Sequence, residues 1–195
     1  MKILLAALLF AAGSALAGTV GQPAPGFTLA DVSGKPVTLA DFRGRYVVLE
    51  WVNPECPYVD KHYGSANMQG LQKEFTSKNT AWLSINSTRE GHNEYYPPQK
   101  MAGWMKEVGG APSATLLDPT GKVGRAYQAR TTPHMYVVDP KGTLVYAGGI
   151  DDKRSTRQED VKTAKNYVRA AMGEALAGKP ISAASTAPYG CSIKY

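Results

Sequence analysis

The sequence is poor in cysteine: only Cys56 and Cys191 occur among its 195 residues. Two thiols exclude a small fold held together by several disulfides. Beyond the first dozen residues no apolar run approaches the roughly 20 residues that cross a bilayer, so we expect no stable membrane insertion. The net charge of +6 is dispersed along the chain. Because no basic patch is interleaved with aromatic residues, the sequence gives no indication of nucleic-acid binding.

Metal-ligand spacing is also missing. The three histidines (His62, His92 and His134) are far apart in the sequence and form no short ligand motif. Zinc and related ions are bound by closely spaced pairs of His or Cys. We therefore expect no metal and no other cofactor.

The first 17 residues have the order of a secretory signal. A single positive charge at Lys2 precedes an apolar run at 3–12, and small residues follow up to Ala17. The alternative, a membrane anchor, is disfavoured because the apolar run is short. We expect cleavage near Ala17 and export to the periplasm or the outside of the cell.

From residue 18 onward, strand patterns alternate with helical ones. Short apolar or alternating runs predict strands, and apolar residues at helical spacing predict helices. The predicted order is a hairpin at 27–39, a strand at 46–52, a helix at 58–77, a strand at 80–85, a helix at 99–108, a strand at 115–117, a hairpin at 135–147 and a helix at 158–177. This order predicts one α/β domain at 18–180, with a mixed central β-sheet flanked by helices, and a polar, flexible tail at 181–195.

Cys56 lies where a buried strand ends and a helix begins. Pro57 suits the first helical turn, where no N–H is required. A thiol at that place faces unpaired backbone N–H groups and the positive end of the helix dipole, which favour the nucleophilic thiolate. Lys61 and His62, one turn later, are candidate thiolate stabilisers if they point towards the sulfur. The alternatives are an inert buried cysteine or one half of a structural disulfide.

Several segments, taken in order, resemble the redoxin superfamily. This superfamily includes alkyl hydroperoxide reductases, thiol-specific antioxidant proteins and exported thioredoxin-like proteins. The resembling segments are 20–29 (VGQPAPGFTL), the hairpin at 34–44, the strand ending in Trp51 with Cys56-Pro57 after it, 118–127 and 132–142. The resemblance implies a thioredoxin-like fold and a thiol-dependent oxidoreductase or antioxidant activity that serves cell redox homeostasis.

The same resemblance implies roles for residues other than Cys56. Pro133 falls where these folds place a cis-proline beside the active cysteine, and Thr132 would supply the backbone that pairs with an extended substrate. Trp51 and Pro57 would help to shape the cleft, and Arg130 is a further candidate to approach the thiolate. The alternatives are a trans-proline that opens an edge strand and a solvated arginine in a loop.

The chain departs from the motifs of its relatives at the residues that surround Cys56. Val59 stands where a thioredoxin pair has its second cysteine. Asn53 and Leu49 replace the Thr or Ser and the Pro of typical peroxiredoxins, and Asp60 replaces the second cysteine of copper-assembly relatives. Standard dithiol exchange, peroxidase chemistry and paired-thiolate copper binding each lack a usual residue.

Cys191 offers a second thiol near the chain end. We expect an exported oxidoreductase in which Cys56 is the nucleophile and Cys191 the candidate resolving thiol, acting on a thiol or disulfide electron donor, a protein disulfide or a peroxide. The alternative is a non-catalytic binding module with a permanent Cys56–Cys191 disulfide, and an unpaired Cys191 is a third possibility.

Overall fold

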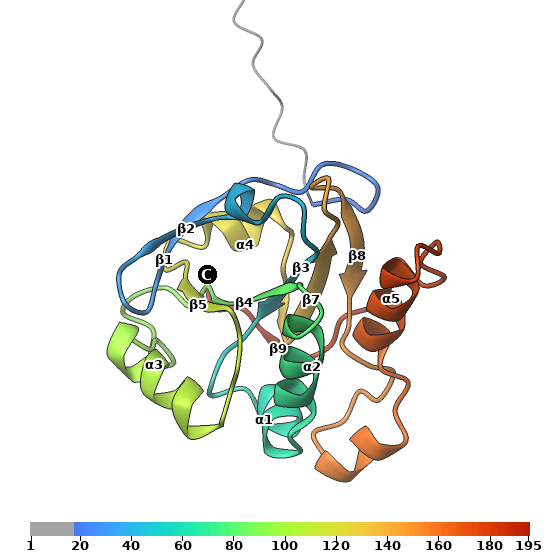
Figure 1. The fold of residues 1–195 in the computed structure, drawn as a ribbon. Helices are drawn as coiled ribbons and strands as arrows, with labels where there is room; N and C mark the ends of the chain where they lie inside the picture. Colours follow the sequence, from blue (N-terminus) through green and yellow to red (C-terminus); the bar gives the residue numbers. More distant parts are fainter. Residues whose placement is uncertain (1–17) are drawn as a thin grey trace, which may run out of the picture.

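The computed structural model describes residues 18–195, so the predicted signal at 1–17 lies outside the described part of the chain. Its centre is a seven-stranded sheet in the order β2-β1-β5-β4-β3-β7-β8 (Figure 1). The strands are β1 (Thr28–Asp31), β2 (Pro36–Thr38), β3 (Val47–Trp51), β4 (Ala81–Asn86), β5 (Ala114–Leu117), β7 (His134–Val138) and β8 (Leu144–Gly148). β3, β4 and β5 run parallel and the other pairs are antiparallel, which confirms the predicted mixed sheet.

Two apolar layers cover the two faces of this sheet. The helices are α1 (Pro57–Gly64), α2 (Asn67–Thr76), α3 (Pro98–Glu107), α4 (Lys122–Ala126) and α5 (Tyr167–Leu176), with 3-10 turns η1 (Leu39–Phe42) and η2 (Gln158–Lys162). Side chains from α1, α2, α3 and α5 form one core layer, and side chains from η1 and α4 contribute to the other. β3 is buried along its whole length because its successive side chains enter opposite layers.

Two of the predicted helices are interrupted. The predicted helix at 58–77 ends at Gly64 and restarts at Asn67, because Ala66 has a left-handed backbone with φ of 58°. The predicted helix at 158–177 is the turn η2 followed by α5. The amide oxygen of Asn166 accepts a 2.8 Å hydrogen bond from the Arg169 N–H, and this cap fixes the start of α5. The short helix α4 was not predicted.

The described residues contain no helix that is long and apolar enough to cross a membrane. They do contain a second, very small sheet, in which β6 (Thr131–Thr132) pairs with β9 (Cys191–Ser192). Neither strand was predicted. This small sheet joins the C-terminal tail to the segment that precedes β7.

A buried carboxyl group lies beneath the helices, on the sheet face that carries Cys56. Glu50 is fully buried in β3. Its oxygens accept hydrogen bonds from four side-chain donors, at distances of 2.7–3.2 Å: Tyr63, Gln72, Trp82 and Ser84. Burial raises the pKa of Glu50 above its usual value, and the four donors act in the opposite direction.

This raised pKa predicts a specific pH dependence of stability. The folded state holds the Glu50 proton more tightly than the unfolded state, so the contribution is complete below the ordinary carboxyl pKa of 4.5 and is lost as the pH rises above it. We expect Glu50→Gln to remove this loss, so that urea unfolding from pH 4 to 8 gives a flatter stability profile than for the wild type.

Glu74→Gln is the matched control. Bonds from Arg169 and Lys78 lower the pKa of the partly exposed Glu74, so its contribution is lost as the pH falls. The two variants should therefore change the pH profile in opposite directions. Parallel profiles for the wild type and Glu50→Gln would contradict the assignment.

Candidate functional site

Cys56 is the N-cap residue of α1 and lies directly beyond the end of β3, as predicted. Its carbonyl oxygen accepts the N–H groups of Val59 and Asp60, each at 2.9 Å, and its own N–H bonds to the Asn53 carbonyl at 3.1 Å. The side chain is only 1% exposed. Its thiol donates a hydrogen bond to the Thr132 carbonyl oxygen, with 3.0 Å between sulfur and oxygen.

The Thr132–Pro133 bond is cis, as the resemblance implied. The contact between the Cys56 thiol and the Thr132 carbonyl brings this bond to the site. Thr132 is buried in β6, and His134 opens β7 directly after the proline. β7 pairs with β3 in a register that sets His134 opposite Trp51. The sheet thus holds the proline segment at the end of the strand that leads to Cys56.

Cys191 completes the site from the other end of the chain. In the β6–β9 ladder it lies directly opposite Thr132, and both cysteines are free thiols. Burial raises the pKa of the Cys191 thiol to about 12, and the neighbouring Cys56 sulfur acts in the same direction through a hydrogen bond and, as a thiolate, through its negative charge. Cys191 is therefore a poor nucleophile in the dithiol form, while it lies next to Cys56.

In the structure, the tail that carries Cys191 is docked on the domain through hydrogen bonds that the sequence analysis did not predict. The Ile193 N–H bonds to the Arg130 carbonyl at 3.0 Å, and the Arg89 N–H bonds to the Lys194 carbonyl at 2.9 Å. The Tyr195 hydroxyl donates to the Ala129 carbonyl at 2.8 Å. Backbone bonds over long sequence distances cannot be recognised from a polar composition.

Lys61 and His62 contact Asp151 and Tyr189. This corrects their predicted role as stabilisers of the Cys56 thiolate. Both are fully buried. Lys61 Nζ lies 3.3 Å from an Asp151 carboxylate oxygen, and the Nε2 of His62 lies 3.1 Å from the Tyr189 hydroxyl. Burial and the nearby Lys61 charge lower the pKa of His62 to about 3, so at neutral pH the ring is uncharged.

The other predicted site residues, Pro57, Trp51 and Arg130, do not lie together in the structure. Pro57 is the first residue of α1, next to Cys56. Trp51 does not shape the cleft, because its position in β3 turns its side chain to the sheet face opposite to Cys56. There it is fully buried against Tyr127 and Tyr136. Arg130 is exposed, and its carbonyl and N–H groups, rather than its guanidinium, bond within the site region.

Several site residues were missed by the sequence analysis. Asn53 accepts the Glu55 N–H at 2.8 Å through its side chain and donates to Glu94 at 2.9 Å, so it shapes the turn that precedes Cys56. Glu94 also lies 3.7 Å from Lys194 of the tail. The Asn-Pro pair is a recognisable turn signal, which could have identified Asn53.

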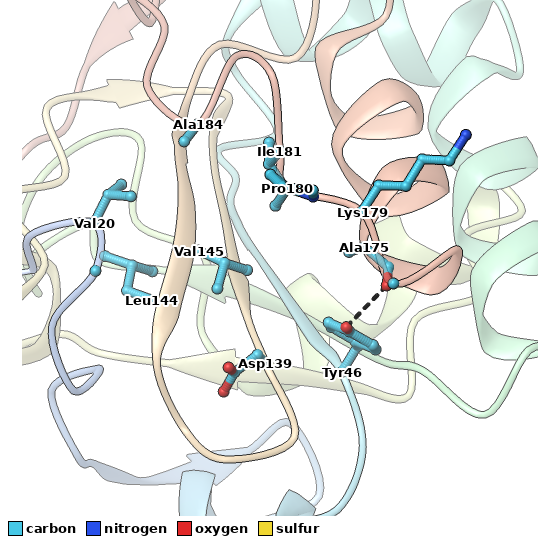
Figure 2. Close-up of a pocket in the computed structure, with 12 residues that line it drawn as sticks. Val20, Tyr46, Asp139, Leu144, Val145, Ala175, Lys179, Pro180, Ile181 and Ala184 are labelled. Carbon is cyan, nitrogen blue, oxygen red and sulfur yellow. Dashed lines mark hydrogen bonds between the residues drawn. The ribbon is translucent and has the colours of Figure 1, made fainter.

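A pocket of about 350 Å³ lies away from both cysteines (Figure 2). It is lined mainly by apolar residues of the N-terminal segment, β8 and the end of α5, among them Val20, Leu144, Val145 and Ile181. The Tyr46 hydroxyl donates to the Ala175 carbonyl at one side of it, at 3.0 Å. Residues 18–195 include no group of three His, Cys, Asp or Glu that could hold a metal ion.

Comparison with protein families agrees with this geometry. The model of the AhpC/TSA family matches residues 20–147, which is more than half of the chain. The chain belongs to this family. The expected membership of the redoxin superfamily is thus confirmed.

Curated relatives of the chain include thiol-disulfide oxidoreductases and a thioredoxin-like protein. The thiol-disulfide oxidoreductase ResA of Bacillus subtilis (strain 168) is 24% identical over 132 residues, which is 64% of this chain and 64% of ResA. The thioredoxin-like protein YneN of the same strain is 27% identical over 150 residues, or 72% of this chain and 79% of YneN. The match covers slightly less than two thirds of ResA.

Solved structures confirm the thioredoxin-like fold. An uncharacterized conserved protein from Geobacillus kaustophilus is 29% identical, with a TM-score of 0.79 over 91% of this chain and 93% of that one. A hypothetical protein from Sinorhizobium meliloti 1021 is 26% identical, with a TM-score of 0.78 over 91% and 94%. A putative thiol:disulfide interchange protein DsbE from Chlorobium tepidum, 20% identical over 66% and 84%, shares the fold with a TM-score of 0.54.

The site predicts low reactivity of the Cys191 thiol. In a Cys56→Ser variant the burial that raises the pKa of Cys191 remains. We expect Cys191 to react with iodoacetamide at pH 8 at least about tenfold more slowly than glutathione, because its thiolate fraction is small. Its rate should still be rising above pH 10, where an ordinary thiol has reached its plateau. A rate and titration like those of glutathione would contradict this assignment.

Proposed function

We propose that this protein is an exported thiol-disulfide oxidoreductase in which Cys56 is the nucleophile and Cys191 the resolving thiol. The observation that carries the proposal is the position of Cys191 opposite Thr132, whose carbonyl also accepts the hydrogen bond from Cys56. Thr132 is therefore a direct neighbour of both cysteines, through its carbonyl for Cys56 and through the strand register for Cys191. The family and the named relatives support thiol chemistry at this place.

The proposed reaction has two exchange steps. The Cys56 thiolate attacks one sulfur of a substrate disulfide, forms a mixed disulfide and expels the other sulfur as a thiolate. Cys191, as a thiolate, then attacks the Cys56 sulfur, so that the Cys56–Cys191 disulfide forms and the second substrate thiol leaves. Two electrons pass from the protein dithiol to the substrate. An external thiol donor restores the dithiol form.

The electrostatics of Cys191 fit this order of events. The neighbouring Cys56 sulfur contributes to the raised pKa of Cys191 through a hydrogen bond and, as a thiolate, through its negative charge. Both contributions disappear when Cys56 is bound to a substrate sulfur. Cys191 thus becomes easier to deprotonate at the step in which it must attack.

A peroxide is the alternative substrate. Cys56 would then become a sulfenic acid with release of water or an alcohol, and condensation with Cys191 would release a water molecule. Asn53 replaces the Thr or Ser of typical peroxiredoxins, and it bonds to the Glu55 N–H, Thr88 and Glu94. The proposal therefore favours disulfide substrates. The proposed export rests on the signal-like sequence at residues 1–17.

Glutathione redox buffers test the resolving role. We expect the wild type to form a Cys56–Cys191 disulfide that is reduced reversibly, at a potential above about −300 mV, while the fold stays intact. A core of this size does not require a disulfide for stability. Acid quenching, alkylation and intact mass report the species, and circular dichroism reports the fold.

The variant Cys191→Ser should instead accumulate a glutathione adduct on Cys56, whereas Cys56→Ser should form much less of it. A disulfide that persists until the protein unfolds would favour the alternative, a non-catalytic module with a structural disulfide. Absence of a Cys56–Cys191 bond in oxidising buffer would refute the resolving role of Cys191.

A further inference from the structure

The last eight residues, 188–195, form a segment that lies across Cys56, and we call it the tail segment. We propose that this segment is a tethered strand that shields Cys56 from solvent, and that Tyr189 is the positioning residue that holds Cys191 in register. The proposal adds an access control to the proposed function and rests on it for the role of Cys191. It is carried by the contacts of Tyr189, Gly190 and β9.

Tyr189 lies two residues before Cys191. Its hydroxyl enters a buried polar site formed by Lys61, His62 and Asp151, which we call the Tyr189 socket. Its hydroxyl donates a short hydrogen bond to the Asp151 carboxylate. The same oxygen accepts from Lys61 Nζ at 3.2 Å and lies 3.1 Å from the Nε2 of His62. The Tyr189 ring packs edge-on against Tyr58, with 5.7 Å between ring centroids. Lys61, His62 and Asp151 are each no more than 2% exposed.

The hydrogen bonds in this socket are mutually consistent. The Asn67 amide lies 2.9 Å from the Nδ1 of His62 and donates to it, which assigns the ring proton to Nε2. Nε2 then donates to the Tyr189 hydroxyl. The hydroxyl thus donates once and accepts twice, which is its full capacity. A socket in which every polar group has a partner defines a single position for the tail segment.

Gly190 brings the tail segment into direct contact with the cis-proline segment. Its φ is 137°, and a Cβ built there would lie 2.0 Å from the Thr132 carbonyl oxygen and 2.7 Å from the Thr132 carbonyl carbon. No larger residue fits without movement of the backbone. Glycine is therefore required at the position immediately before Cys191.

The tail segment covers the edge strand that borders Cys56. β6 pairs with β9 alone and takes no part in the seven-stranded sheet. An unpaired edge is a template for an incoming extended strand, and here the protein's own chain end occupies it. With the segment docked, Cys56 is 1% exposed, so a reagent reaches the sulfur when the segment leaves. When the segment returns, the socket and the glycine contact set Cys191 against Cys56.

Alkylation of Cys56 in a Cys191→Ser background measures this shielding without using the resolving thiol. Tyr189→Phe keeps the ring and removes the hydroxyl with its three polar contacts. We expect it to raise the rate of iodoacetamide modification of Cys56 at neutral pH about tenfold, since the shielded population falls. Gly190→Ala displaces the segment sterically and should raise the rate at least as much.

Tyr46→Phe in the same background is the matched control. It removes the hydroxyl–carbonyl bond to Ala175 at the apolar pocket (Figure 2), whose lining includes no residue of the tail segment. Its rate should equal that of the background protein. Circular dichroism and urea unfolding identify any variant that is not folded, in which case the other tail variant decides.

Unchanged alkylation rates in the folded tail variants would overturn the proposal. An equal rise in both tail variants and in Tyr46→Phe would show that the whole fold is destabilised, and this would also overturn it. A rise in Gly190→Ala without one in folded Tyr189→Phe would refute the positioning role of Tyr189. The glutathione experiment on the wild type is independent: if no Cys56–Cys191 disulfide forms there but the tail variants expose Cys56, the shielding stands and the proposed resolving role fails.

Discussion

The pairing of β6 with β9 is the constraint on which the site depends. It joins the cis-proline segment to the chain end, and both lie against the strand-to-helix junction at Cys56. Several otherwise unrelated features follow from it. Position 190 must be glycine because two backbones meet there, and the partial burial of Cys191 in β9 raises the pKa of its thiol. The buried Lys61 has the Asp151 carboxylate as its partner, and the same carboxylate accepts a hydrogen bond from Tyr189 of the tail.

Local sequence signals were sufficient for the main architecture. β3 is a continuous apolar run, and Pro57 marks the first turn of the helix that follows, so the position of Cys56 at the junction could be predicted from neighbouring residues alone. The turn signals Asp-Pro-Thr-Gly at 118–121 and Asp-Pro-Lys-Gly at 139–142 directly follow the ends of β5 and β7, so local residues also mark these strand ends. The cis bond at Pro133 followed from the family resemblance, since the local sequence also suits an ordinary edge strand.

Features that depend on contacts between distant segments could not be predicted. The helical spacing around Lys61 and His62 is compatible with side chains that face the thiol, and only the fold shows that Asp151 and Tyr189 bind them instead. Trp51 lies five residues before Cys56 in sequence, yet strand alternation turns it to the opposite core layer. The tail has a polar composition typical of mobile ends, but its order comes from pairing with backbone groups more than fifty residues away.

The place of the second thiol changes how the redox chemistry is coupled to the fold. A second cysteine one helical turn after Cys56 would be held by the helix itself, but that position is the buried Val59, which contributes to the core. Cys191 comes instead from the end of the chain, and its effective concentration at Cys56 depends on the fraction of time that the tail is docked. In the proposed mechanism, the contacts that dock the tail therefore have two effects, since they shield Cys56 and they bring Cys191 to it. Any change in the Tyr189 socket should alter both together, which a helix-borne cysteine pair would not do.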